Sequence, residues 1–182
     1  MPDRLALLRG LNVGGKNLVK MADLRAAYED LGYDDVATYI QSGNVLFRSP
    51  REPAAELATR MEKELTKELG IQLKLVLLTE PQLRKVVEAA PRGFGSDDCR
   101  NDVIFLRKPL TPAKAYAVAE TREGIDSKWK ANGVVYFSRL TERASGSRLG
   151  RITQRPEYKD LTIRSWGTTQ KLLGLLADRA AP

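Results

Sequence analysis

The pattern of apolar and polar positions in the first half of the chain alternates between two periods. Short apolar runs, typical of strands, are separated by stretches in which apolar residues recur every three or four positions, typical of helices. Gly32 and Gly70 follow the helical stretches as stop signals. The pattern predicts strands at residues 5–8, 36–40, 45–47 and 71–78, and helices at 21–31 and 53–69. The first half is therefore expected to have a β-α-β-β-α-β order.

The second half of the chain shows a similar order of elements. Thr79 with Gln82 three residues later is a capping pair, which predicts a connecting helix. Thr111 followed by Pro112 predicts the start of a further helix, and an Asn-Gly pair ending at Gly133 is a strong hairpin signal. The remaining expected elements are strands at 102–106, 128–131 and 134–137, a short helix within 143–151 and a last helix at 168–178.

The repeated order predicts an α+β fold built from two ferredoxin-like β-α-β-β-α-β-type halves with a C-terminal helix. The first half is expected at residues 1–79 and the second half, with the C-terminal helix, at residues 101–182. Residues 80–100 are expected to form a connecting helix and loop.

Composition excludes several kinds of site. The 182 residues include no histidine and one cysteine, Cys99, so neither a Ser-His-Asp nor a Cys-His site can exist. Enzyme chemistry would depend on Asp, Glu, Lys, Tyr or a metal held by oxygen ligands, and no cofactor or metal is expected. No apolar stretch approaches the roughly 18–20 residues that cross a bilayer, and no signal peptide is recognised. A cytoplasmic protein without membrane contact is therefore expected.

Charge is distributed unevenly along the chain, whose formal net charge is +7. Residues 1–90 hold 13 Lys/Arg and 13 Asp/Glu, whereas residues 91–182 hold 17 and 10. This asymmetry favours an anionic partner for the second half, either nucleic acid or a phosphorylated ligand. The alternative is a solvated basic surface that serves solubility.

The segment from Gly10 to Asn17 follows the first expected strand and has the G-x-x-x-x-G-K spacing of a phosphate-binding P-loop. A P-loop holds Mg²⁺ through Ser or Thr where this chain has Asn17, and its helix begins at the lysine. The helix here is expected to begin only at residue 21, and the hairpins argue against the parallel sheet of a P-loop protein. The segment is therefore not interpreted as an NTP-hydrolysing loop.

The same segment is interpreted instead as an anion cradle. Gly14 and Gly15 can expose consecutive backbone N–H groups, and Lys16 adds positive charge before a helix N-terminus. The alternative is a tight β–α connection in which Asn12 and Asn17 bond the loop to itself.

Two further segments carry candidate binding side chains. The hairpin turn at 41–44 could read a base edge or an amide, or could satisfy only its own backbone. The start of the last helix is favourable to anions, and Trp166 there could stack on a base or pack into the core. The residues expected to contact a ligand are Arg9, Asn12, Gly14, Gly15, Lys16, Asn17, Lys20, Gln41, Ser42, Asn44, Arg164, Trp166, Thr168 and Lys171.

Two further patterns could bind a single strand or a metal ion. Lys128-Trp-Lys130 beside Tyr136 is a basic and aromatic pair of strands of the kind that binds single strands by stacking, although sheet faces also carry aromatics for packing. Asp97, Asp98 and Asp102 could hold Mg²⁺ or form a solvated loop.

Three segments together resemble the bacterial domain-of-unknown-function 1697 family. They are Ala6-Leu-Leu-Arg-Gly-Leu-Asn-Val-Gly-Gly-Lys-Asn17, Thr38-Tyr-Ile-Gln-Ser-Gly-Asn-Val45 and Thr162-Ile-Arg-Ser-Trp-Gly-Thr168. The resemblance covers nearly the whole chain and implies a two-part α+β fold, but it implies no activity. The family pattern has Asn where this chain has Ser165 and Gly167, so a ligand contacted there in relatives would be bound differently here.

Three functions remain open. The first is a binding module for nucleic acid or another polyanion, based on the basic second half. The second is an enzyme that acts on a phosphorylated or nucleotide-like small molecule, with the three segments lining one cleft. The third is a non-catalytic adaptor or structural protein in which the motifs only shape loops.

Overall fold

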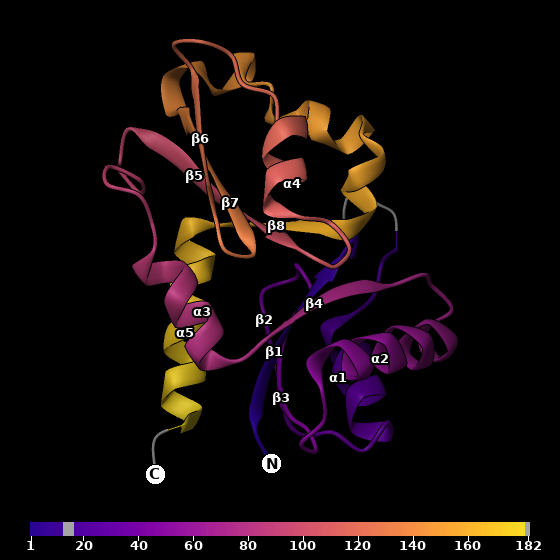
Figure 1. Ribbon diagram of the computed structural model, residues 1–182. Coiled ribbons are helices and arrows are strands. Elements are labelled where there is room, and N and C mark those ends of the chain that lie inside the picture. Colours follow the sequence, from indigo (N-terminus) through magenta and orange to yellow (C-terminus); the bar gives the residue numbers. More distant parts are fainter. Residues whose placement is uncertain (13–16, 181–182) are drawn as a thin grey trace. The chain divides into compact units, whose positions relative to one another are not determined.

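A computed structural model describes residues 1–12 and 17–180 (Figure 1). The chain forms two compact units. The first unit runs from Met1 to Leu83 and includes the C-terminal segment from Leu172, and the second unit is Arg84–Lys171. Helix α5 (Trp166–Ala180) contributes residues to both units, whereas the sequence predicts the whole C-terminal helix in the second half. The expected boundaries at 79 and 101 stay predictions.

The first unit is built on a four-stranded antiparallel sheet. Its strands are β1 (Asp3–Arg9), β2 (Asp34–Tyr39), β3 (Asn44–Arg48) and β4 (Lys74–Leu78), in the order β2-β3-β1-β4. Helices α1 (Met21–Asp30) and α2 (Ala54–Leu69) connect them in the β-α-β-β-α-β sequence of a ferredoxin-like fold. The predicted helix start at residue 21 and stop at Gly70, whose φ is 66°, are confirmed.

The core of the first unit lies between one sheet face and these helices. Because side chains alternate along a strand, Ala6 and Leu8 of β1 face the helices together with their neighbours on β3, Val45 and Phe47. The ring of Phe47 packs edge-on against Tyr28 of α1 at 5.2 Å between ring centres. Each buried side chain of this size stabilises the fold by roughly 1.5–3 kcal/mol.

The second unit repeats the sheet with different coverage. Its strands are β5 (Cys99–Leu106), β6 (Asp126–Ala131), β7 (Val134–Leu140) and β8 (Leu161–Ser165), in the corresponding order β6-β7-β5-β8. Helix α4 (Pro112–Val118) follows the first strand, as α1 does in the first unit. The position equivalent to α2 holds the short 3-10 helices η1 (Thr141–Gly146), η2 (Leu149–Gln154) and η3 (Pro156–Asp160). The predicted α+β fold with two ferredoxin-like halves is confirmed.

Local signals placed several elements correctly. The backbone N–H of Thr79 donates to Gln82 at 2.9 Å before helix α3 (Glu80–Glu88), and Thr111 caps α4 by accepting from the Lys114 amide at 3.3 Å. Strands β6 and β7 form the hairpin expected at Gly133, whose φ is 80°. Strand β8 was not expected, because residues 161–165 read as the approach to the last helix.

Candidate functional site

Asn12 holds the loop that follows β1. Its side-chain oxygen accepts from the Val19 amide at 2.9 Å, and its side-chain nitrogen donates to the Val19 carbonyl at 3.0 Å. The same nitrogen donates to the Gln41 carbonyl at 3.2 Å, which ties the loop to the β2–β3 turn. Asn17 donates to the Gly10 carbonyl at 3.1 Å. Two of the three predicted segments therefore meet within the first unit.

The β2–β3 turn packs directly against β1. The Leu8 amide donates to the Gly43 carbonyl at 2.8 Å, and a Cβ added at Gly43 would lie 2.9 Å from the Leu8 Cβ. The fully buried Asn44 donates its side-chain amide to the Tyr39 carbonyl at 3.0 Å. The amides of Asn12, Asn17 and Asn44 are thus engaged with backbone, which supports the alternative in which these segments shape loops.

The charged candidates of the first unit lie around this junction. Arg9 is half-buried at the end of β1, and Lys20 is exposed immediately before α1. Gln41 and Ser42 are exposed in the turn. Gly14, Gly15 and Lys16, the centre of the expected anion cradle, lie outside the described residues. Ligand contact by these residues stays a prediction.

The third predicted segment belongs to the second unit. Arg164 of β8 is 7% exposed, and its Nη1 donates to Thr162 Oγ1 at 2.8 Å and to the Ile163 carbonyl at 2.9 Å. Burial lowers the pKa of Arg164 to about 10. Ser165 caps α5 by accepting from the Thr168 amide at 3.2 Å, and Lys171 is exposed. The prediction that this segment lines one cleft with the first two stays a prediction.

An aromatic cluster covers one face of the second sheet. Phe94 packs edge-on against Trp129, Tyr136 and Trp166, with ring centres 5.1–6.2 Å apart. Tyr136 is 1% exposed, and its hydroxyl donates to the Val86 carbonyl at 2.5 Å. Sequence reasoning missed Phe94, although a phenylalanine between two glycines in a polar loop was the available signal. Trp166 accordingly packs against Phe94, the packing role that the sequence left open.

Two side chains of the expected single-strand platform on β6 and β7, Lys128 and Tyr136, are engaged within the fold. Lys128 donates its ammonium to the carbonyls of Tyr116 and Ala119 at 2.6 and 2.8 Å, at the end of α4. The buried Tyr136 offers no exposed ring on which a base could stack. In this hairpin Trp129 and Tyr136 therefore pack against Phe94, and Lys128 bonds carbonyls at the end of α4.

Five arginines gather where the loop after α4 meets η1 and η2. We call them the arginine cluster: Arg122, Arg143, Arg148, Arg151 and Arg155. One carboxylate oxygen of Asp126 accepts from the backbone amides of both Arg122 and Arg148 at 2.9 Å. The guanidinium of Arg122 donates to the Gly146 carbonyl at 3.2 Å, and that of Arg143 donates to the Gly124 carbonyl at 3.3 Å. Three of these contacts join the loop after α4 and the start of β6 to segments 19 to 24 residues further along the chain.

Positive charge in this cluster is only partly offset. Glu120 forms ion pairs with two cluster members, Arg151 at 3.1 Å and Arg155. Hydrogen bonds from Arg155 and Arg151 lower the pKa of the Glu120 carboxyl. Arg122 and Arg143 are exposed, and their guanidinium groups bond only neutral carbonyls within the described ranges 1–12 and 17–180. Their charges are therefore not neutralised by an ion pair in this part of the chain.

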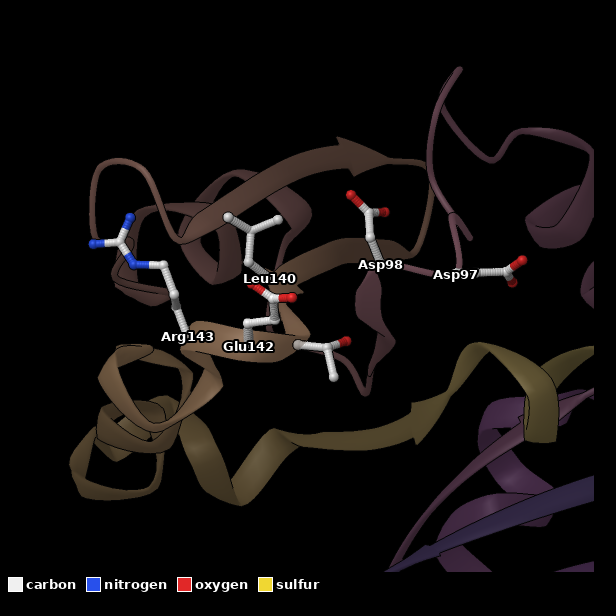
Figure 2. Close-up of a pocket in the computed structure, with 6 residues that line it drawn as sticks. Asp97, Asp98, Leu140, Glu142 and Arg143 are labelled. Atoms are coloured by element: carbon white, nitrogen blue, oxygen red, sulfur yellow. The ribbon is translucent and has the colours of Figure 1, made fainter.

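A cavity of about 470 Å³ borders the cluster at Arg143. It is lined by Asp97, Asp98, Leu140, Thr141, Glu142 and Arg143. Figure 2 shows Asp98, Leu140 and Glu142 between Asp97 on one side and Arg143 on the other. The Thr141 amide donates to the Asp98 carbonyl at 2.9 Å, which joins the two walls. A hydrogen bond from the Ser96 side chain lowers the pKa of Asp98 and keeps that carboxylate ionised.

The carboxylates near this cavity do not form a metal centre. Asp102 pairs with Arg139 at 2.9 Å, and burial raises the pKa of its carboxyl. Among the described residues, no group of three or more His, Cys, Asp or Glu side chains is placed to hold a metal ion. The magnesium hypothesis for Asp97, Asp98 and Asp102 is therefore wrong.

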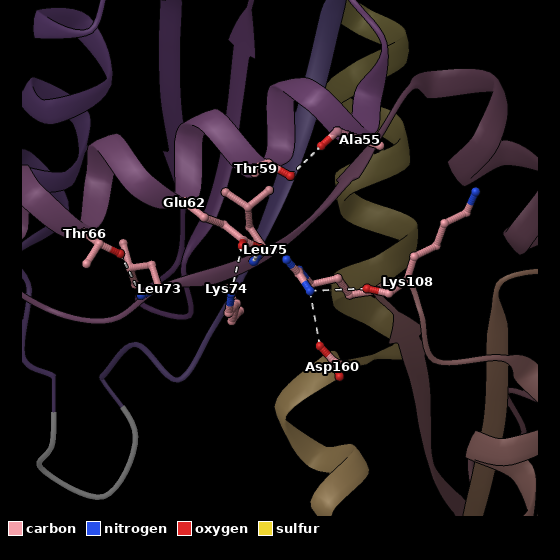
Figure 3. A network of polar contacts seen from close by, with 10 residues as sticks. Ala55, Thr59, Glu62, Thr66, Leu73, Lys74, Leu75, Lys108 and Asp160 are labelled. Carbon is pink, nitrogen blue, oxygen red and sulfur yellow. Dashed lines mark hydrogen bonds and ion pairs between the residues drawn. The ribbon is translucent and has the colours of Figure 1, made fainter.

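Two other cations of the second unit, Arg107 and Lys114, have carboxylate partners. Arg107 donates to Asp160 at 3.2 Å and to the Lys108 carbonyl at 3.2 Å, and Figure 3 labels these two acceptor residues. Lys114 pairs with Glu157 at 3.4 Å. The arginine cluster differs from these pairs because Arg122 and Arg143 are exposed and have no carboxylate partner for their guanidinium groups among the described residues.

Comparison with known proteins places the chain in a family. A conserved bacterial protein, SP0830 from Streptococcus pneumoniae, has a solved structure that matches with a TM-score of 0.81 and 28% sequence identity. The match covers 96% of this chain and 98% of that one. A search of curated proteins found no match. Across the part of the chain that the structure describes, no helix is long and apolar enough to cross a bilayer. The chain belongs to the family described as protein of unknown function (DUF1697), which matches residues 1–136.

Proposed function

We propose that this protein binds nucleic acid or another phosphate-bearing polyanion through its second unit. The proposal rests on how charge divides between the units. The first unit holds 12 Lys/Arg and 13 Asp/Glu, a net charge of −1, whereas the second holds 18 and 10, a net charge of +8. A concentrated positive field attracts phosphate backbones and supplies most of the affinity of sequence-independent binding. The cytoplasm is the proposed setting.

The observation that carries the proposal is the arginine cluster. A guanidinium has five N–H donors in a planar fork that matches two phosphate oxygens. Arg122 and Arg143 each use Nη1 for a neutral carbonyl, which orients the group and leaves donors for a ligand. Arginine is better suited than lysine to such contacts, because its geometry is fixed and its hydration weaker.

The test compares two double variants of the full-length chain. Arg122→Gln with Arg143→Gln removes two charges and keeps a polar side chain at each exposed position. Lys63→Gln with Lys67→Gln removes two exposed charges from α2 of the first unit and serves as the matched control. Fluorescence anisotropy with labelled single- and double-stranded oligonucleotides, measured between about 50 and 200 mM salt, gives both affinity and salt slope.

Wild-type affinity is expected to fall steeply with salt, and the arginine double variant to bind at least about tenfold more weakly, with the log–log salt slope reduced by about 2. The lysine control is expected to match wild type. Absence of binding at low salt would overturn the proposal, and so would an equal loss in both variants.

A second function is favoured by one observation, the cavity of about 470 Å³ beside Arg143. Its size lies in the range of small-molecule sites. A phosphorylated or nucleotide-like small molecule, bound there and acted on, is the alternative to a polymeric polyanion. The absence of histidine confines such an enzyme to carboxylate, lysine or tyrosine chemistry.

A further inference from the structure

The geometry points to a guanine nucleotide as the ligand of the cavity between Asp98 and Glu142, with Glu142 reading the base and Arg143 contacting the phosphate. This inference rests on the proposed function, because the phosphate end uses the arginine cluster. It adds a base-specific pocket to a surface that otherwise binds phosphate without regard to sequence.

The lining of the cavity combines three kinds of group. Leu140 supplies an apolar wall for the face of a ring, and Asp98 and Glu142 supply acceptor oxygens. Arg143 supplies a cation at the border with the cluster. A nucleotide has the same three parts: a flat ring, a polar edge and an anionic tail. A purely anionic ligand such as phosphate would be repelled by the carboxylates.

Guanine fits the acceptor pair better than the other bases do. A carboxylate offers two acceptor oxygens and no donor. Guanine presents two adjacent donors, N1–H and the N2 amino group, which match those oxygens. Adenine and cytosine place a donor beside an acceptor, and that acceptor would face a carboxylate oxygen.

Glu142 is the better placed of the two carboxylates for this contact. Within residues 1–12 and 17–180, its side chain makes no hydrogen bond or ion pair, so both oxygens are available. Asp98 already accepts from the side chains of Ser96 and Cys99. We therefore assign base reading to Glu142, with Asp98 completing the polar wall.

Isothermal titration calorimetry of the full chain at low salt tests the assignment with three probes: guanosine 5′-monophosphate, inosine 5′-monophosphate and inorganic phosphate. Inosine monophosphate differs from guanosine monophosphate only by lacking the N2 amino group. Wild type is expected to bind the guanosine nucleotide at least about tenfold more tightly than the inosine nucleotide, because a lost partner leaves a carboxylate oxygen unpaired. Phosphate is expected to bind most weakly.

Two isosteric variants complete the test. Glu142→Gln replaces one acceptor by a donor and is expected to abolish the preference for guanosine over inosine. Glu123→Gln, an exposed residue of the same unit that does not line the cavity, is expected to retain it. Both positions are exposed, so folding is expected to be unaffected.

The outcomes separate the two proposals. Equal binding of the guanosine and inosine nucleotides, or a preference that survives Glu142→Gln, overturns the pocket assignment while salt-dependent oligonucleotide binding stands. If wild type does not bind oligonucleotides at low salt, the proposed function is overturned, and so is the phosphate contact assigned to Arg143.

Discussion

The two units share a strand order and differ in what covers the sheet. In the first unit, amphipathic helices α1 and α2 lie on one sheet face and bury a continuous apolar core. In the second unit, the place of α2 is taken by short 3-10 helices whose side chains clamp backbone groups. Leu149 and Ile152 of η2 still pack into an apolar core with Phe137 of β7, so the second unit adds arginine contacts to apolar packing rather than replacing it.

The ionic contacts of the units differ in the same way. In the first unit, Glu62 of α2 accepts from the Leu75 amide and the Lys74 ammonium, both at 3.1 Å, and so ties the helix to β4 (Figure 3). Arg179 pairs with Asp3 and Asp35 at 2.9 Å each. In the second unit, Glu120 is shared by two arginines and Asp126 by two backbone amides. Carboxylates are scarce there, so positive charge remains at the surface.

The largest expected effect compares the hairpin turns of the two units. Gly43→Ala in the first unit adds a methyl group 2.9 Å from the Leu8 Cβ at a φ of 69°, and is expected to cost about 2–4 kcal/mol of unfolding free energy. At Gly133 in the second unit φ is 80°, but apart from its chain neighbours no atom of the described residues would lie within 4 Å of the added Cβ, so Gly133→Ala is expected to cost about 1 kcal/mol. Urea denaturation measures both values. Equal costs would contradict the packing of the first turn against β1.

A smaller effect is expected at Asp126, which organises the arginine cluster. Asp126→Ala leaves the amides of Arg122 and Arg148 without their shared acceptor, and is expected to cost about 2–3 kcal/mol and to weaken oligonucleotide binding. Asp97→Asn, at an exposed position, is the control and is expected to change stability by less than about 0.5 kcal/mol. Thermal unfolding and anisotropy measure the two consequences. If Asp126→Ala is destabilised but binds the oligonucleotide as tightly as wild type, the two amide contacts of Asp126 are not needed for binding.

The smallest expected effect is a pH dependence at Glu120. Its pKa is lowered from an ordinary 4.5 by hydrogen bonds from Arg155 and Arg151, so the ionised form is favoured in the folded state. Its contribution is present above pH 4.5 and is lost as pH falls through the lowered value. The melting temperature of wild type should therefore exceed that of Glu120→Gln near neutral pH and converge with it in acid. Glu123→Gln should follow wild type throughout, and a gap that persists in acid would contradict the pairing.

Local sequence signals predicted much of the fold because their physical causes are local. The Thr79–Gln82 pair, Thr111 before Pro112 and the turn at Gly133 each act within four residues. Strand β8 was missed because it ends at Ser165 and α5 begins at the next residue, Trp166, with no turn residue between them. Its identity as a strand comes from pairing with β5, which sequence periodicity does not show.

The candidate site was harder to predict for a related reason. Asn12 was recognised, and the alternative role assigned to it, bonding within the loop, is the one the structure supports. The arginine cluster depends on Asp126 meeting Arg148, which lies 22 residues away, and on loops exchanging contacts with glycine carbonyls. The uneven charge was visible in the sequence, but the contacts that leave some arginines unneutralised were not.

The most direct measurement of the difference between the units is a nuclear magnetic resonance titration of the full chain with a single-stranded oligonucleotide. The amides of Arg122 and Arg148, which both donate to Asp126, report on the arginine cluster, and those of Lys63 and Lys67 report on α2. The account predicts salt-sensitive shifts at Arg122 and Arg148 and none at Lys63 and Lys67. Shifts concentrated on α2, or an unchanged spectrum at low salt, would contradict it.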